Sequence, residues 1–290
     1  MLSRFLASLL IIPLALISGC GGGGGDSSTS SASNSAGTNT GQLAYEGLWL
    51  GNYVNAGSGG TSLGLVFINQ NNELFSLSES QPRTIGPKTF EIGNLKINGT
   101  SFAGSGLKTA SSQIPFSAID LKYRDPTIQG LNYNTYYLKI SGSIIGNSGL
   151  SIFYNLADNN NYNLSMTAIS NTLYNYNKQA SINDLGKSWS IYASNLSAVL
   201  DGYKRSAINI NADGTFSSTD STCNFSGKFT PNSSGKNYFN VSLTTAASNC
   251  SKPNSAFSGV GIVFTAIDGE KRIVIATYDA TKQYTAFITN

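Results

Sequence analysis

Apolar and polar residues alternate along much of this chain with the two-residue period of β-strands that bury one face. The pattern is clear at 138–144, where Leu, Ile and Gly alternate with Lys and Ser, and at 238–243, where Phe, Val and Leu alternate with Tyr, Asn and Ser. Turn-forming Asn-Gly and Asp-Gly pairs separate such runs at 98–99, 213–214 and 268–269. After the N-terminal apolar run no segment sustains a helical period, so the sequence predicts an all-β fold of antiparallel strands.

An internal repeat divides these strands into two groups. Trp189 follows Trp49 by 140 positions, and each Trp comes shortly after a Gly and before apolar runs of similar spacing. At the other end of the repeat, the stretch 151–166 is echoed by 273–288. Self-similarity at a fixed offset is the sequence signature of repeated structural units.

The repeat predicts a first β domain at 42–170, a connector at 171–180 and a second β domain at 181–290. Each domain has enough short antiparallel strands to close into a small barrel or to pack as a two-sheet sandwich. One larger sheet structure that spans both repeats is the alternative. Trp49 and Trp189 are expected to plug the interiors, because a large aromatic residue near a first strand usually packs.

The chain begins with a short apolar segment that follows Arg4. Residues 6–17 are almost entirely apolar, but the run is shorter than the ~20 residues that span a bilayer, so it is typical of a cleaved secretory signal. The motif Ile-Ser-Gly-Cys at 17–20 resembles the lipobox of bacterial lipoproteins. The resemblance implies that residues 1–19 are removed and that Cys20 is acylated and anchored in a lipid bilayer. An ordinary signal peptide with an accidental Cys is the alternative.

Residues 20–41 consist almost entirely of Gly, Ser, Thr, Asn and Ala, with Asp26 as the single charge. Such a segment buries too little surface to offset the entropy of ordering it. We therefore expect a flexible tether with a root-mean-square span of about 25 Å. Gly21 stands where an Asp commonly marks inner-membrane retention in bacterial lipoproteins, and this resemblance favours the outer membrane. The composition fits display on the cell surface and a periplasmic location equally.

Two further resemblances concern the folded part. The Gly-Leu-Trp opening at 47–49 is similar to the opening of lipocalin-like barrels. Tandem β domains behind a Gly-rich lipid tether also resemble surface lipoproteins of the transferrin-binding-protein type. The first resemblance implies closed barrels that can enclose a small ligand, and the second implies recognition of a partner at the cell surface.

Cys223 and Cys250 form an even pair once Cys20 carries lipid, and an exported protein meets an oxidising environment. We expect a disulfide in the second domain, with metal binding by the pair as the alternative. The chain contains no His, which removes the commonest zinc ligand and the commonest general base. Its 15 Asp and Glu residues show no spacing that would pair two carboxylates. The sequence therefore predicts no enzyme activity, no metal and no cofactor.

One stretch of the second half has the spacing of a calcium loop. The residues at the ligand and glycine positions are Asn209, Asn211, Asp213, Gly214, Ser217 and Asp220. The first of them is not acidic, the last is not Glu, and an Asp-Gly pair is by itself enough to specify a hairpin turn. A turn is therefore the preferred interpretation.

The net charge is +3, and charged residues make up only 11% of the chain, which offers no basic stripe for nucleic acid. Asn, Ser, Thr, Gly and Tyr dominate instead, a composition suited to adaptable contacts with proteins or glycans. The aromatic-rich positions expected to contribute to ligand binding are Tyr133, Tyr136, Tyr137, Tyr174 and Tyr176. The alternative is that these rings pack, because aromatic residues favour strands.

Two classes of function remain. The first is a non-enzymatic outer-membrane lipoprotein, on the cell surface or the periplasmic face, that binds a protein or a glycan. The second is a lipocalin-like carrier of a small apolar ligand, and a structural envelope component is a further alternative. Inward-facing Phe, Ile and Leu would fill the interiors, whereas inward-facing Gly and Ser would leave a cavity. Phe67, Phe75, Ile140, Phe239 and Val241 are expected inside, so the sequence favours the first class.

Overall fold

The computed structural model describes residues 45–55, 61–80, 89–110, 135–146, 148–156, 161–194, 204–218, 223–247, 250, 252–280 and 285–289. These residues all belong to one structural unit, 41–290. The expected lipidation site at Cys20, the tether and Tyr133 lie outside the described residues. Within the described ranges, no helix combines the length and the apolar character needed to cross a bilayer.

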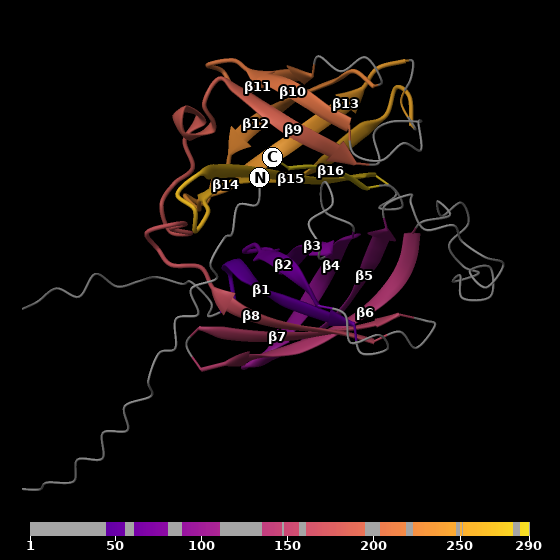
Figure 1. Ribbon diagram of the computed structural model, residues 1–290, viewed down its shortest axis with the longest axis vertical. Helices are drawn as coiled ribbons and strands as arrows, with labels where there is room; N and C mark the ends of the chain where they lie inside the picture. Colours follow the sequence, from indigo (N-terminus) through magenta and orange to yellow (C-terminus); the bar gives the residue numbers. More distant parts are fainter. Residues whose placement is uncertain are drawn as a thin grey trace, which may run out of the picture. The chain divides into compact units, whose positions relative to one another are not determined.

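The first eight strands form a closed antiparallel barrel, in which each strand pairs with the next and β8 pairs back with β1 (Figure 1). The strands are β1 (Gly47–Asn55), β2 (Thr61–Ile68), β3 (Glu73–Ser80), β4 (Thr89–Asn98), β5 (Ser101–Ala110), β6 (Thr135–Ile145), β7 (Gly149–Leu156) and β8 (Asn161–Ala168). Closure leaves no free sheet edge that another chain could extend.

The second barrel repeats this order and closes by pairing β16 with β9. A 3-10 turn, η2 (Ile182–Leu185), precedes it. The strands are β9 (Ser188–Ser194), β10 (Lys204–Ile210), β11 (Thr215–Ser218), β12 (Phe225–Pro231), β13 (Phe239–Thr245), β14 (Ala256–Thr265), β15 (Lys271–Asp279) and β16 (Thr285–Thr289). The prediction of an all-β chain with tandem β domains is confirmed, and both domains are barrels instead of sandwiches.

The first strand of each barrel has a Trp near its start, and the two Trp side chains make the same hydrogen bond. Trp49 is buried, and its indole N–H donates a hydrogen bond to the carbonyl of Tyr45 at 3.0 Å. The indole N–H of Trp189 donates to the carbonyl of Leu185, which again lies four residues earlier. Both rings pack against the core of their own barrel, as the sequence predicted.

The hairpins β2–β3 and β10–β11 also share their geometry. The turn residue Asn72 has a φ of 60°, and its counterpart Gly214 has a φ of 82°. The carbonyl of Asn72 accepts a hydrogen bond from the backbone N–H of Leu95, and that of Gly214 accepts one from Phe229, both at 2.9 Å. Leu95 in β4 and Phe229 in β12 therefore occupy equivalent positions, so the two barrels can be compared residue by residue at this corner.

Glycine allows the strands to approach each other closely where the sheets bend. A Cβ at Gly106 in β5 would lie 2.0 Å from the carbonyl oxygen of Ile92, and a Cβ at Gly227 in β12 would lie 2.1 Å from that of Ser242. Such distances are far below van der Waals contact, so any side chain at these two positions would push the paired strands apart. Glycine kinks of this kind are the usual means of curving a sheet into a barrel.

Apolar side chains pack the interior of both barrels. The first interior holds Trp49, Tyr53, Val66, Ile68, Leu74, Leu95, Phe102, Leu138, Ile140, Leu150, Ile152, Tyr154, Leu164 and Met166. The second holds Ile191, Ile208, Ile210, Phe216, Phe225, Phe229, Phe239, Val241, Leu243, Phe257, Ile273 and Ile275, with Leu185 of η2 in the same cluster. Ile140, Phe239 and Val241 thus lie inside, as predicted.

A third apolar cluster, here called the inter-barrel interface, joins the outer faces of the two barrels. Its buried members are Leu48, Phe67, Phe75, Leu77 and Ile92 of the first barrel, Tyr174 and Tyr176 of the connector, and Tyr238, Val260, Ile262, Phe264, Val274 and Ala276 of the second barrel. The ring centroids of Phe67 and Tyr238 lie 5.4 Å apart. The prediction that Phe67 and Phe75 fill the first interior is wrong, because β2 is apolar on both faces and both rings lie on the outer face that packs against the second barrel.

Candidate functional site

Polar and aromatic side chains line the interior of the first barrel at the end opposite Trp49. Four of them lie within two residues of a strand end: Tyr53 in β1, Glu91 in β4, Tyr154 in β7 and Tyr162 in β8. The fifth is Ser76 in β3, the cross-strand partner of Glu91. We call these five residues the polar belt. The mouth of a β-barrel is a frequent place for a ligand site, which makes the belt the candidate functional site.

Glu91 lies at the centre of the polar belt. Its side chain is fully buried, as are those of Ser76 and Tyr154. The hydroxyl of Tyr53 donates to Glu91 Oε1 at 3.5 Å, which is long for such a bond. The centroid of the Tyr53 ring lies 5.0 Å from that of Tyr162 and 6.3 Å from that of Tyr154, with tilted planes in both pairs. Tyr53 and Tyr154 therefore lie beside the carboxylate, and Tyr162 packs on Tyr53.

The hydroxyls of Tyr53 and Tyr154 stay protonated at physiological pH. Burial raises the pKa of Tyr53 and of Tyr154 well above the ordinary value of 10, and the negative charge of Glu91 raises both further. Both groups are therefore hydrogen-bond donors as well as acceptors. A hydrogen bond with the Ser76 side chain acts in the opposite direction on the pKa of Tyr154.

The second barrel has apolar residues at two of these positions and Ser218 at the position of Ser76. The matching turn contacts of Leu95 and Phe229 align Glu91 with Phe225, which is buried in the second interior. The matching Trp anchors align Tyr53 with Ala193. The Glu91 carboxylate and the Tyr53 ring thus have no counterpart in the second barrel and are not required for the shared fold. An inward-facing Glu among apolar neighbours of β4 was the sequence signal for it, and the sequence analysis missed it.

The tyrosines predicted to bind ligand fall into separate groups. Tyr133 lies outside the described residues. Tyr136 and Tyr137 lie in β6, and Tyr136 is the cross-strand partner of Lys108, which is in turn the partner of Glu91. The backbone register therefore brings Tyr136 to the same level of the sheet as the polar belt.

Tyr174 and Tyr176 require a correction, because both are only 3% exposed and belong to the inter-barrel interface. The Tyr174 hydroxyl donates to the carbonyl of Asn237. The Tyr176 ring stacks on that of Tyr238 with centroids 6.4 Å apart, and Lys236 Nζ lies 5.0 Å from its centroid. These rings pack the connector between the barrels and do not present a ligand-binding surface, as the packing alternative had anticipated.

Acidic side chains at the inter-barrel interface accept hydrogen bonds from neighbouring residues. Glu73 Oε1 accepts a hydrogen bond from the hydroxyl of Tyr278 at 3.1 Å, and Glu73 Oε2 accepts one from the Asn69 side-chain amide at 2.8 Å. Burial raises the pKa of Glu46, whereas the positive charge of Lys236 and a hydrogen bond from Tyr176 act in the opposite direction. The interface thus contains carboxylates whose role is structural.

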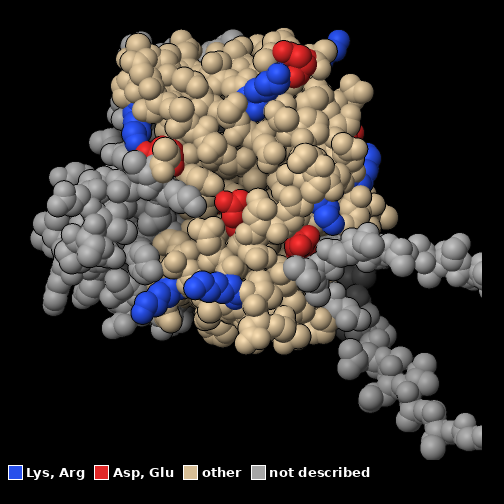
Figure 2. Space-filling model, turned by 180° about the vertical axis from the view of Figure 1, so that it is seen from behind, with Lys and Arg blue, Asp and Glu red and all other residues tan. Residues whose placement is uncertain are grey.

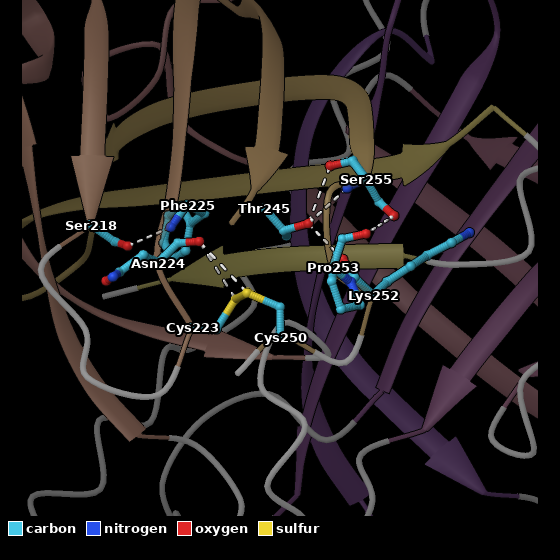
Figure 3. Close-up of a disulfide and its surroundings, with 9 residues drawn as sticks. All are labelled: Ser218, Cys223, Asn224, Phe225, Thr245, Cys250, Lys252, Pro253 and Ser255. Carbon is cyan, nitrogen blue, oxygen red and sulfur yellow. Dashed lines mark hydrogen bonds between the residues drawn. A yellow bond between two sulfur atoms is a disulfide. The ribbon is translucent and has the colours of Figure 1, made fainter. Parts of the chain in front are cut away.

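The prediction of a Cys223–Cys250 disulfide is confirmed, with the two Cα atoms 4.7 Å apart (Figure 3). Both residues are buried. The bond connects the segment before β12 with the segment before β14, and the carbonyl of Asn224 points toward both sulfur atoms. Beside it, Thr245 Oγ1 donates to the carbonyl of Lys252 at 2.6 Å and accepts from the backbone N–H of Ser255 at 3.0 Å. The disulfide therefore rules out metal binding by this pair.

The stretch with calcium-loop spacing forms a turn. Asp213 Oδ1 accepts hydrogen bonds from the backbone N–H of Thr215 at 3.0 Å and from its hydroxyl at 2.7 Å, and these bonds lower the pKa of Asp213. Asn211 donates to the same hydroxyl at 2.9 Å. Asp220 lies outside the described residues. No group of three or more His, Cys, Asp or Glu side chains in the described part of the chain could hold a metal ion.

The outer faces of the barrels are polar and carry few charges. On β12 and β13 the exposed side chains are Ser226, Lys228, Thr230, Asn240, Ser242 and Thr244. Figure 2 shows one side of the molecule, where tan residues predominate and the blue and red side chains lie singly or in small groups. On the outer face of the first barrel, Phe153 in β7 is 47% exposed, and its cross-strand partners are Ser141 and Asn163. Hydroxyl and amide groups therefore dominate the surface available to a partner.

No protein-family model matches the chain, and no curated protein matches it either. Among solved structures, a candidate outer membrane protein of Bacteroides fragilis matches with 11% identity and a TM-score of 0.26, over 84% of this chain and 96% of that one. A protein of unknown function from the DUF3598 family of Nostoc punctiforme matches with 12% identity and a TM-score of 0.24, over 85% and 94%. A mutant of the vaccine antigen Transferrin Binding Protein B from Haemophilus parasuis matches with 9% identity and a TM-score of 0.26, over 79% and 65%. These values do not assign the chain to a family.

Proposed function

We propose that this protein is an outer-membrane lipoprotein, anchored through Cys20, that binds a protein or glycan partner at the cell surface and catalyses no reaction. The observation that carries the binding role is the packing of both barrel interiors with apolar side chains. Such interiors leave the barrel mouths and the outer faces as the surfaces on which a partner can be recognised. The lipid anchor rests on the Ile-Ser-Gly-Cys motif at 17–20.

The chemistry of the outer faces fits this role. Ser, Thr and Asn side chains supply hydrogen bonds that adapt to a partner, and exposed aromatic rings supply contact area at a low cost in conformational entropy. Exposed charges are sparse on the face seen in Figure 2, so recognition there depends on hydrogen bonds and ring contacts more than on ion pairs.

The positions of the acidic residues support a non-catalytic role. Asp279 pairs with Lys252 beside the disulfide-bonded segment. Asp268 and Glu270 both pair with Arg272, at 2.7 and 2.6 Å. A glycosidase-type mechanism needs two carboxylates that face each other across a substrate. The carboxylates of these three residues instead form ion pairs with neighbouring cations.

A carrier of a small apolar ligand is the less favoured function. Such a ligand would need an open apolar chamber, but aromatic and aliphatic residues pack both interiors. The mouth of the first barrel is lined by the hydroxyls and the carboxylate of the polar belt, which an apolar ligand would leave without hydrogen bonds. These observations direct attention to polar partners.

The anchor and the topology are tested together on living cells. Metabolic labelling with a palmitate analogue should mark the wild-type protein, and a Cys20→Ala variant should lose the label. Protease added to intact cells should then degrade the barrels of the wild-type protein. A periplasmic soluble protein, which should survive until the outer membrane is permeabilised, is the control. Protection of the barrels on intact cells would contradict surface display, and labelling of the Cys20→Ala variant would contradict the anchor.

A further inference from the structure

We propose that the turn end of the first barrel docks on the lipid surface in which Cys20 is anchored. The turn end is the barrel end formed by the β2–β3, β4–β5 and β6–β7 turns, together with the start of β1 and the end of β8. Antiparallel pairing brings these segments to one end of the barrel. This inference rests on the lipid anchor of the proposed function and adds the surface through which the folded part meets the bilayer.

The chain from the anchor joins the barrel at the turn end. The described residues begin at Tyr45, two positions before β1 starts at Gly47. Only residues 21–44 separate Cys20 from Tyr45, and a linker of this composition has a root-mean-square span of about 25 Å. A short tether gives the turn end an effective concentration near the bilayer in the millimolar range. Even a weak contact with lipid is therefore sufficient for docking.

Two neighbouring hairpins of the turn end carry three isoleucines. Ile145, the last residue of β6, is 59% exposed. Ile144 beside it and Ile97 near the end of β4 are half-buried and pack against the first interior. The backbone N–H of Ile144 donates to the carbonyl of Thr100 at 2.8 Å, which joins the β6–β7 hairpin to the β4–β5 turn. The turn end therefore presents aliphatic groups from two adjoining hairpins instead of one isolated side chain.

The charges around these isoleucines suit an anionic bilayer. Lys96, next to Ile97, is exposed, and neither 94–103 nor 141–151 contains an Asp or Glu. Glu73, on the strand beside β4, is held by two hydrogen bonds from neighbouring side chains. Apolar side chains beside a basic residue are typical of protein surfaces that enter the headgroup region of a membrane.

The corresponding hairpin of the second barrel, β14–β15, has a different chemistry. Ile267 at its tip is 87% exposed, but Asp268 and Glu270 follow it, and both pair with Arg272. Insertion of this tip would carry two carboxylates toward the acyl chains, at a cost in desolvation. Exposure of an isoleucine is therefore not enough for docking, and Ile267 provides a matched control position.

Docking through the turn end would also orient the first barrel. The polar belt lies near the opposite end, where Tyr53 and Glu91 stand close to the end of β1 and the start of β4. A barrel docked in this way has its mouth directed away from the bilayer. The candidate functional site then stays accessible to a partner.

The test uses the full-length lipidated protein in vesicles of phosphatidylethanolamine and phosphatidylglycerol. Because Cys20 is acylated and Cys223 and Cys250 form the disulfide, a Thr100→Cys variant has one free thiol for the fluorescent dye NBD. Vesicles that also contain a lipid with a nitroxide on its acyl chain quench a dye that lies in the membrane. NBD at position 100 should be quenched several-fold more strongly than NBD in an Ile267→Cys variant.

Two further substitutions in the Thr100→Cys variant test the apolar contact. Ile145→Ser should remove most of the quenching, because it replaces the most exposed isoleucine of the turn end. Phe153→Ser also removes an exposed apolar side chain, but from the outer wall of the same barrel, and should leave the quenching unchanged. Both residues are exposed, so both variants should keep the melting temperature of the parent.

The inference is overturned if NBD at position 100 is not quenched, if the Ile267→Cys label is quenched equally, or if Ile145→Ser has no more effect than Phe153→Ser. An acylated protein without quenching would contradict docking alone. Absence of the palmitate label would contradict the anchor itself, so the two proposals fail by different measurements.

Discussion

The two barrels share their topology, their Trp anchors and their first hairpin, but their interiors are built from different residues. The second barrel fills its interior with four Phe residues of β11, β12 and β13 and adds a disulfide. The first barrel has no Cys in its strands and places the polar belt at its mouth. Both repeats bury polar side chains, but different ones: Ser76 and Glu91 in the first, and Ser218, Thr277 and Asp279 in the second.

The comparison separates what the fold requires from what it permits. Glycine kinks, anchored Trp residues and closing pairs occur in both barrels, so they belong to the architecture. Glu91 and Tyr53 occur in one barrel only, at positions where the other has Phe225 and Ala193. Natural sequences usually violate local packing rules at functional sites. Because the two barrels share one fold, each serves as a reference for the residues of the other.

The largest effect is expected in the core of the second barrel. Phe229 is fully buried, and its ring centroid lies 4.8 Å from that of Phe216 and 5.7 Å from that of Phe239. Phe229→Ala removes this ring and should lower the free energy of unfolding by about 3–5 kcal/mol. Urea unfolding measures the loss, with Trp189 as the probe in a Trp49→Phe background. The exposed neighbour Lys228 is the control, since Lys228→Ala should change stability by less than about 0.5 kcal/mol. Equal effects would contradict the packed interior.

The second-largest loss of stability is expected when the disulfide is removed. If the barrels unfold independently, only the second barrel should be destabilised. Its two cysteines are 27 positions apart, and in the chain-entropy model a loop of that size stabilises by about 3.5 kcal/mol. A Cys223→Ser/Cys250→Ser variant should lose stability of that order. Single-Trp variants that retain Trp49 or Trp189 report on the two barrels separately. A loss seen equally by both probes would show that the interface makes the barrels unfold as one unit, and no loss at either probe would contradict the prediction.

Much of this fold could be predicted from the sequence because its signals are local. Alternation specifies strands, and Asn-Gly or Asp-Gly pairs specify turns in which Gly99, Gly214 and Gly269 have φ values of 59°, 82° and 83°. Closure into barrels depends on pairs such as β1 with β8, which are far apart in the chain and leave no local signal. The choice between barrel and sandwich therefore stayed open.

Sequence reasoning failed where a strand is apolar on both faces. In β2, Val66 points inward and Phe67 points toward the second barrel, and alternation does not say which face is the interior. The same limit applies to Tyr174 and Tyr176, whose composition suggested a surface but whose burial depends on the docking of two barrels. Glu91 was missed because a single Glu in a strand is ordinarily read as solvent-exposed.

A smaller effect is expected from one hydrogen bond across the inter-barrel interface. Tyr278→Phe removes the bond from its hydroxyl to Glu73 and should lower the free energy of unfolding by about 1 kcal/mol. In a Glu73→Gln background the same substitution should cost less, which a double-mutant cycle measures. Additive losses in the cycle would mean that the Tyr278–Glu73 contact contributes nothing to holding the barrels together.

The smallest effect should come from Glu46, which tests whether the inter-barrel interface prefers a neutral group. Burial raises the pKa of Glu46 above its ordinary value of 4.5, so the folded protein binds this proton more tightly than the unfolded chain does. The resulting stability is present below pH 4.5 and is lost as the pH rises through the raised pKa. Glu46→Gln should therefore be slightly more stable than the wild type at pH 7, and the difference should vanish at pH 4.

Thermal unfolding between these pH values measures this difference. A loss of stability in Glu46→Gln at pH 7 would reverse the conclusion. It would mean that the attraction of Lys236 and the hydrogen bond from Tyr176 outweigh the cost of burying the carboxylate, so that the interface selects the charged form. The buried carboxylate of Glu46 would then be explained by the architecture of the interface, whereas the buried carboxylate of Glu91 in the polar belt would not.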